Sequence, residues 1–177
     1  IVHHDAFFLT IGSDGMLAQA DASEPAIQLQ VFKDEKTDDI EAIRISSRHW
    51  KNVKEALIEF GGDRDAIRRM FTDCAPEFKR AAKELGIAAL KGTPGRPTSH
   101  AKAERGNQTC LEWGRHGMLK SGLPLEWADY AVRHEMMHRR CKLKDDGSSI
   151  YTERHPGCKV PKLRAFGSKV IFRPHLC

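Results

Sequence analysis

The sequence predicts an α/β domain in which helices cover a mixed β-sheet. Short segments rich in β-branched and aromatic residues alternate with longer segments whose apolar residues recur every three or four positions. The first strand-like segments are joined by tight turns, as antiparallel strands are, and the later ones are separated by helices. With 177 residues, 40% hydrophobic and 30% charged, the chain has the composition of a globular domain.

The N-terminal part is expected to open with antiparallel strands and then a long helix. The expected elements are a strand over residues 1–11, a turn at 12–15, a strand over 16–22 and a strand over 26–32. Apolar residues three or four apart between Asp38 and Phe60 then predict one amphipathic helix, which Gly61 and Gly62 end.

The second half is expected to alternate strands with helices. The expected elements are a strand over 66–72, helices over 76–85, 99–120 and 125–140, a buried strand over 87–90, a rigid loop over 92–97 and a strand pair within 163–172. The order is β-β-β-α-β-α-β-α-α, and we expect Trp50, Trp113 and Trp127 in the core. We assign residues 1–140 to one domain and 141–177 to a linker with a small extension. Because the chain begins with Ile1 rather than Met, we expect it to be a trimmed piece of a longer polypeptide.

Composition excludes several classes of protein. No stretch approaches the roughly 18 apolar residues of a membrane span. The five cysteines are odd in number and include no Cys-x-x-Cys pair, which argues against a disulfide framework and favours a reducing compartment, the nucleus or cytoplasm. The net charge is +5, with acidic residues concentrated before residue 42 and basic residues after Lys91. This balance permits a polyanionic partner.

Three carboxylates stand where α/β sheets build sites. Asp5 lies in the first expected strand, Asp73 ends the fourth, and Glu104 lies early in the helix that follows the rigid loop. If the two strands are neighbours, the three carboxylates converge. Such a set binds hard divalent cations, because unneutralised carboxylates repel one another. With 24 acidic residues in the chain, surface ion pairs or helix caps are the competing interpretation.

Four blocks, in order, resemble retrotransposon and retroviral integrase cores. Residues 71–78 (Phe-Thr-Asp-Cys-Ala-Pro-Glu-Phe) resemble the Asp-Asn-Gly-x-Glu-Phe block of that family. Residues 93–107 resemble its Pro-x-x-Asn-Gly-x-Ala-Glu-Arg-x-Asn block. Residues 121–128 resemble the segment that follows in copia-type elements, and residues 163–168 resemble that group's Leu-x-x-Phe-Gly-Cys tail.

The resemblance implies an RNase H-like fold: a five-stranded mixed sheet with helices on both faces. It implies that Asp5, Asp73 and Glu104 are the Asp-Asp-Glu catalytic and metal-binding triad, holding two Mg²⁺ or Mn²⁺ ions. The implied activity is metal-dependent DNA strand transfer and endonucleolytic cutting, with element ends and target DNA as partners, in a homo-oligomer without a membrane. The expected DNA-binding residues are Arg96, Lys102, Arg105, Asn107 and Arg115.

Two departures from the family pattern leave an alternative open. Cys74-Ala75 and His100-Ala101 replace two Asn-Gly pairs whose glycines ease tight backbone near the site. The alternative is a catalytically decayed, integrase-derived nucleic-acid-binding domain. Asp21 is the rival of Asp5 as the first metal ligand.

A zinc-protease motif gives a third reading. His134-Glu135-Met136-Met137-His138 matches His-Glu-x-x-His, in which two histidines share a helix face and the glutamate acts as base. Glu153 is a conceivable third ligand. No Gly-x-x-His continuation follows, and the helix that carries the motif also matches the integrase pattern. We predict that it is not a catalytic zinc site.

Overall fold

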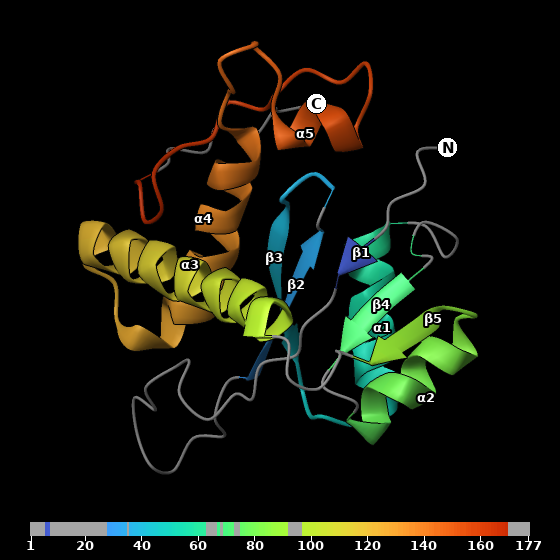
Figure 1. The fold of residues 1–177 in the computed structure, drawn as a ribbon. Coiled ribbons are helices and arrows are strands. Elements are labelled where there is room, and N and C mark those ends of the chain that lie inside the picture. Colours follow the sequence, from blue (N-terminus) through green and yellow to red (C-terminus); the bar gives the residue numbers. More distant parts are fainter. Residues whose placement is uncertain are drawn as a thin grey trace, which may run out of the picture.

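The computed structural model describes residues 6–7, 28–34, 36–62, 67, 69–72, 75–91 and 97–169. The strands are β1 (Ala6–Phe7), β2 (Gln28–Asp34), β3 (Ile40–Ile45), β4 (Arg69–Thr72) and β5 (Ala88–Lys91). The helices are α1 (Trp50–Gly61), α2 (Pro76–Glu84), α3 (Pro97–Ser121), the short 3₁₀ helix η1 (Leu125–Trp127), α4 (Ala128–Cys141) and α5 (Ile150–Arg154). The molecule is therefore α/β, as expected (Figure 1).

The strands form two hydrogen-bonded ladders. β1 pairs antiparallel with β2, which pairs antiparallel with β3, whereas β4 pairs parallel with β5. β1 lies beside β4, so the strands follow one another in space as β3-β2-β1-β4-β5 (Figure 1). The expected single five-stranded sheet is not seen: among the described residues, no ladder joins β1 to β4. The described β1 is only two residues long, so it offers few backbone groups for pairing on a second side.

Helices cover both faces of the β2–β3 hairpin, which confirms that part of the prediction. The strand residues that pack with α1 and α2 are Phe32, Ile43 and Ile45. Those that pack with α3 and α4, around Cys110, Val132 and Met136, are Leu29, Val31, Ile40 and Ala42. Because neighbouring strand residues point to opposite faces, each strand contributes to both cores.

The expected helix over residues 38–60 is wrong in its first half. Ile40–Ile45 forms β3, and α1 begins only at Trp50, where the His49 ring nitrogen accepts a hydrogen bond from the Lys51 N–H at 3.4 Å. Since β3 is buried on both faces, its apolar residues do not alternate with polar ones, and the spacing of Ile40 and Ile43 resembles that of a helix. The expected strand over 16–22 lies outside the described residues.

The later elements follow the prediction closely in position, but the strand expected to be buried over 87–90 is not: only Ile87 is buried, and Ala88, Ala89 and Leu90 are exposed. Pro76 begins α2, as the sequence indicates, and α3 and α4 pack against each other. This packing is close because α3 presents Gly114 and Gly117 to α4: a Cβ on Gly117 would lie 2.9 Å from Glu135 Cγ. Of the three tryptophans expected in the core, half-buried Trp113 packs against it, whereas Trp127 is 46% exposed and Trp50 is only half-buried.

The C-terminal part holds one element that the sequence did not predict. A bridge between Leu143 and Ser149 closes the polar linker, and Ser149 and Thr152 cap α5 reciprocally. Residues 163–169 contain no strand; the remainder of the expected strand pair lies outside the described residues. None of the described helices combines the length and apolar character that a membrane span requires.

Candidate functional site

The structure describes the predicted site only in part. Asp5, Asp73 and the rival Asp21, together with Arg96, lie outside the described residues. The residues next to the first two in sequence, Ala6 and Thr72, belong to β1 and β4, which are adjacent strands. The three carboxylates were expected to converge if these two strands are neighbours, and this condition is met.

Glu104 lies two turns into α3 and is exposed. Gly106 and Asn107, two and three residues further along the helix, are buried, and a Cβ on Gly106 would lie 3.9 Å from Lys33 Cδ in β2. Because Asn107 follows Glu104 by three residues, Glu104 lies on the exposed side of α3, next to its buried face. Its carboxylate has no ion pair or side-chain hydrogen bond to any described residue, so it is available to an external ligand.

The basic residues expected to bind DNA share α3 with Glu104. Arg105 and Arg115 are exposed and have no ion-pair partner among the described residues. Arg115 follows Glu104 by eleven residues, three helical turns, so both lie on the same stripe about 16 Å apart along the axis. Lys102 is also in α3, but its side chain is not described. This stripe can offer cations to a phosphate backbone next to a free carboxylate.

Asn107 is placed differently from the arginines. It is only 8% exposed, and its Oδ1 atom is buried without a hydrogen-bond partner. Leaving a buried acceptor unpaired costs about 1–3 kcal/mol. Its role in DNA binding stays a prediction, and it would have to act from beside the stripe rather than on it.

The His-Glu-x-x-His motif lies on α4, where the rings of His134 and His138 are 4.7 Å apart. The His134 ring also packs 5.5 Å from Phe166, and His138 Nε2 lies 2.9 Å from the carbonyl oxygen of Arg164. Glu153, the conceivable third ligand, instead forms an ion pair with Lys144. Among the described residues, no three His, Cys, Asp or Glu side chains are grouped so as to hold a metal ion.

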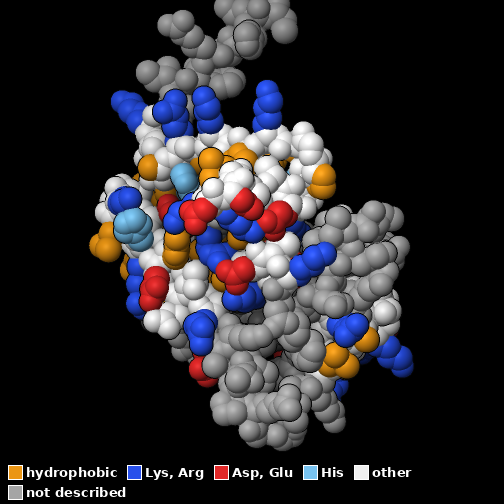
Figure 2. Space-filling view, turned by 45° about the horizontal axis from the view of Figure 1, so that its top comes forward, with side chains coloured by type: hydrophobic (Ala, Val, Ile, Leu, Met, Phe, Trp, Pro, Cys, Tyr) orange, Lys and Arg blue, Asp and Glu red, His pale blue; other side chains and the backbone are white. Residues whose placement is uncertain are grey.

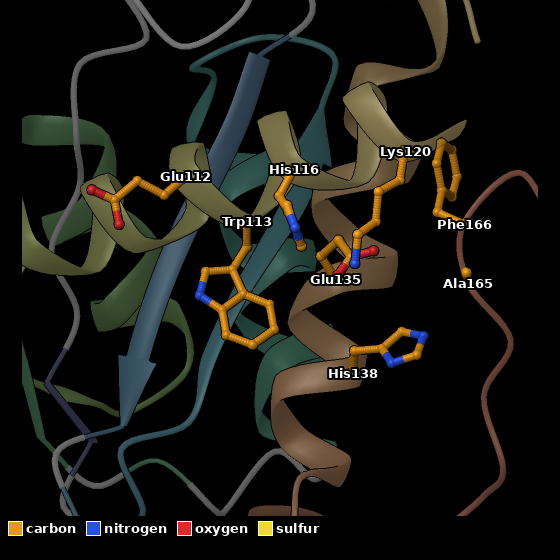
Figure 3. A pocket seen from close by; sticks show the side chains of 8 residues that line it. All are labelled: Glu112, Trp113, His116, Lys120, Glu135, His138, Ala165 and Phe166. Atoms are coloured by element: carbon orange, nitrogen blue, oxygen red, sulfur yellow. The ribbon is translucent and has the colours of Figure 1, made fainter. Parts of the chain in front are cut away.

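A cavity of about 570 Å³ lies between α3, α4 and the segment around Phe166 (Figure 3). Figure 3 shows Glu135 between the two helices, near Lys120 and His116, with His138 one turn along α4. The full lining consists of Glu112, Trp113, His116, Lys120, Glu135, His138, Ala165 and Phe166. Ligand pockets commonly combine apolar walls with a few polar groups. Because this cavity is lined by both acidic and basic side chains, it does not favour an anionic over a cationic ligand.

A buried charge network holds the C-terminal elements to the hairpin. Asp39, 1% exposed, pairs with Arg140 Nε at 3.0 Å and with Arg154, while Arg140 also reaches Glu41 at 2.9 Å. Burial alone would lower the pKa of Arg140, but the charges of Asp39 and Glu41 outweigh it and raise that pKa. Figure 2, which brings the α5 end forward, shows acidic and basic side chains intermingled there.

Sequence reasoning missed this network because its partners are about a hundred residues apart. The only local signal is the run Asp38-Asp39 in one segment and Arg139-Arg140 in another, whose charges are complementary. On α3, burial raises the pKa of the Cys110 thiol to about 12, so that this thiol is a core group rather than a reactive one.

Comparison with solved structures identifies the fold. The chain superposes on a chain of the simian T-cell lymphotropic virus intasome in complex with PP2A regulatory subunit B56 gamma, with a TM-score of 0.62 and 15% identity over 92% of this chain and 59% of that one. It also superposes on the catalytic core domain of BIV integrase, with a TM-score of 0.56 and 17% identity over 72% of this chain and 85% of that one. Neither a known family model nor a curated protein sequence matches the chain.

These likenesses establish an integrase-core-like fold. This chain spans about three fifths of the length of the intasome chain that it matches. At 15% and 17% identity, shared architecture does not by itself carry an activity, which has to be argued from the site.

Proposed function

We propose that this chain is the catalytic core of a copia-type retrotransposon integrase, which joins element ends to target DNA by metal-dependent strand transfer. The observation that supports it most strongly is the agreement between motif order and fold. The block around Asp73 follows β4, the block around Glu104 opens α3, and β4 lies beside the strand that follows Asp5, in a fold like that of integrase cores.

In this proposal Asp5, Asp73 and Glu104 form the metal-binding set. Three carboxylates suit hard divalent cations, and Glu104, the member whose side chain is described, is exposed and unpaired among the described residues. Two Mg²⁺ or Mn²⁺ ions held by such a set stabilise the charge on the attacking and leaving oxygens of an in-line phosphoryl transfer.

The other residues position the nucleic acid. Arg96, Lys102, Arg105 and Arg115 hold phosphates, and Asn107 contacts the DNA from beside Glu104. Contacts to phosphates carry no sequence information, so target choice is nearly sequence-independent. The protein works as a homo-oligomer on DNA inside the nucleus or cytoplasm, where its cysteines stay reduced.

The experiment is strand cutting and joining by the purified chain on oligonucleotide substrates, with Mg²⁺, with Mn²⁺ and with EDTA. The proposal predicts cut and joined products that require the metal. DNA binding without cutting in any metal would instead support the decayed, integrase-derived binding domain, which the replacements Cys74-Ala75 and His100-Ala101 favour.

The zinc-protease reading is tested separately. We predict zinc well below one equivalent in protein purified without added metal, and unchanged strand transfer in a His138→Ala variant. Stoichiometric zinc that is lost in this variant together with a peptidase activity would replace the proposal with a protease.

A further inference from the structure

A second group of cations lies on α1 and α2, the helices that cover the face of the hairpin opposite α3 (Figure 1). At its centre is the half-buried indole of Trp50, the first residue of α1. The Arg80 guanidinium carbon of α2 lies 4.3 Å from the ring centroid, and the amino nitrogens of Lys51 and Lys54 each lie 5.9 Å from it. We call Trp50, Lys51, Lys54 and Arg80 the Trp50 cluster.

The cations of the Trp50 cluster differ from the arginines of α4 and from Lys144 of the linker. Those of α4 and the linker find carboxylates: Arg133 pairs with Glu59 at 2.8 Å, Arg139 with Asp38, and Lys144 with Glu153. Lys51, Lys54 and Arg80 have no ion-pair partner among the described residues, although Glu55, Glu77 and Glu84 lie on the same two helices. Three positive charges thus converge on one ring without a described anion.

The three cations repel one another, and their contacts with the indole ring offset this repulsion only in part. A cation–π contact at an exposed site contributes about 0.5–1 kcal/mol, and like charges brought to one place oppose it. The indole holds the guanidinium of Arg80 through this cation–π contact. The N–H groups of Arg80 have no hydrogen-bond partner among the described residues, and a guanidinium can bind phosphate through two of them. Lys79 and Lys83 of α2 are also exposed.

We propose that the Trp50 cluster is a second nucleic-acid-binding surface, which takes the phosphodiester backbone. Combining aromatic side chains with unpaired cations is how proteins bind nucleic acid without reading its sequence. The Trp50 cluster lies on α1 and α2, on the other side of the hairpin from Glu104 and Arg115 of α3. It can therefore hold a nucleic-acid strand that α3 does not contact. It does not depend on the proposed strand transfer, because it requires neither metal nor the carboxylate triad.

The test measures binding by fluorescence anisotropy in EDTA, where no metal-dependent chemistry occurs, with one labelled 20-nucleotide strand and the matching duplex as probes. The double variant Lys51→Ala/Arg80→Ala is compared with Arg133→Ala/Lys144→Ala, which removes the same charge from exposed but ion-paired positions. The cluster variant should lose about fivefold or more in affinity, and its salt slope should fall by about 2 because each phosphate contact contributes about 0.9. The control should bind nearly as the parent does.

Variants of Trp50 test the cluster without changing the net charge of the protein. Trp50→Ala leaves the charge unchanged but removes the platform, so affinity should fall, whereas Trp50→Phe should retain most of it. Equal losses in the two double variants, or a well-folded Trp50→Ala protein that binds as the parent does, would overturn the proposal. The additional variant Arg105→Ala/Arg115→Ala tests the α3 stripe in the same assay, so the two surfaces succeed or fail separately.

Discussion

Gly114 of α3 lies so close to Val132 of α4 that a Cβ on the glycine would stand 2.4 Å from the Cγ2 atom of the valine. No real Cβ contact is so short, so the two helices can cross as they do only if residue 114 has no side chain. The crossing matters for the site, because it sets where α3, and with it Glu104, lies over the sheet.

Gly114→Ala should therefore destabilise the protein by about 1–3 kcal/mol through overpacking. Gly106→Ala on the same helix is the matched control, since its Cβ would meet only Lys33 Cδ at 3.9 Å. That substitution should stabilise the helix by up to about 1 kcal/mol. Urea unfolding followed by circular dichroism measures both, and equal effects of the two substitutions would contradict the close crossing.

The Asp39 network should be the most sensitive charged feature of the described fold. Asp39→Ala leaves Arg140 and Arg154 without their buried partner, and breaking a buried pair in this way costs about 3–5 kcal/mol. Glu59→Ala breaks the exposed pair with Arg133 and should cost less than about 1 kcal/mol. Unfolding free energies of the two variants check this, and similar losses would show that Asp39 is better solvated than the structure indicates.

Protonation of Asp38 should lower the stability of the protein at acid pH. Burial by itself would raise the pKa of Asp38, but the hydrogen bond from Lys33 and the charge of Arg139 outweigh it, and the pKa is lowered. The ionised form is thus favoured by folding, so its contribution is present above the unfolded pKa, about 3.9, and is lost as the pH falls through the lower folded value.

Asp38→Asn should make the stability depend less on pH in the acid range. Asparagine tolerates the positive φ of 60° at this position, so the substitution removes the charge without adding backbone strain. Melting temperatures measured between about pH 7 and pH 2.5 should fall less steeply below about pH 4 in the variant than in the parent. Parallel profiles would mean that Lys33 and Arg139 do not favour the carboxylate in the folded state.

Sequence patterns predicted the helices of the second half well, because α3 and α4 have strong start and stop signals and one buried face. They failed for β3, because Ile40 and Ile43 pack into opposite cores. With apolar residues on both faces, the strand lacks the alternation of apolar and polar residues by which strands are recognised. They also missed α5, which is five residues long and is held by the capping pair Ser149 and Thr152 rather than by an amphipathic face.

The candidate site was predictable to the extent that it follows motifs. Glu104 was proposed from the block of residues around it and stays a prediction, while the adjacency of β1 and β4 meets the condition for the expected convergence. The Trp50 cluster was not predictable, because Arg80 reaches Trp50 only through the packing of α2 on α1, and local spacing carries no sign of it. Trp50 itself was wrongly expected in the core.

Strand transfer by triad variants tests the central claim most directly. Asp5→Asn, Asp73→Asn, Glu104→Gln and the control Glu112→Gln, an exposed glutamate two turns further along α3, are assayed with Mg²⁺ and Mn²⁺ after their fold has been checked by circular dichroism. We predict that the first three lose cutting and joining, that Glu112→Gln retains both, and that Asp21→Asn does far less harm than Asp5→Asn. Near-normal activity in a folded Asp73→Asn or Glu104→Gln protein would contradict the assignment of the site, and loss in Asp21→Asn with activity kept in Asp5→Asn would contradict the choice of the first ligand.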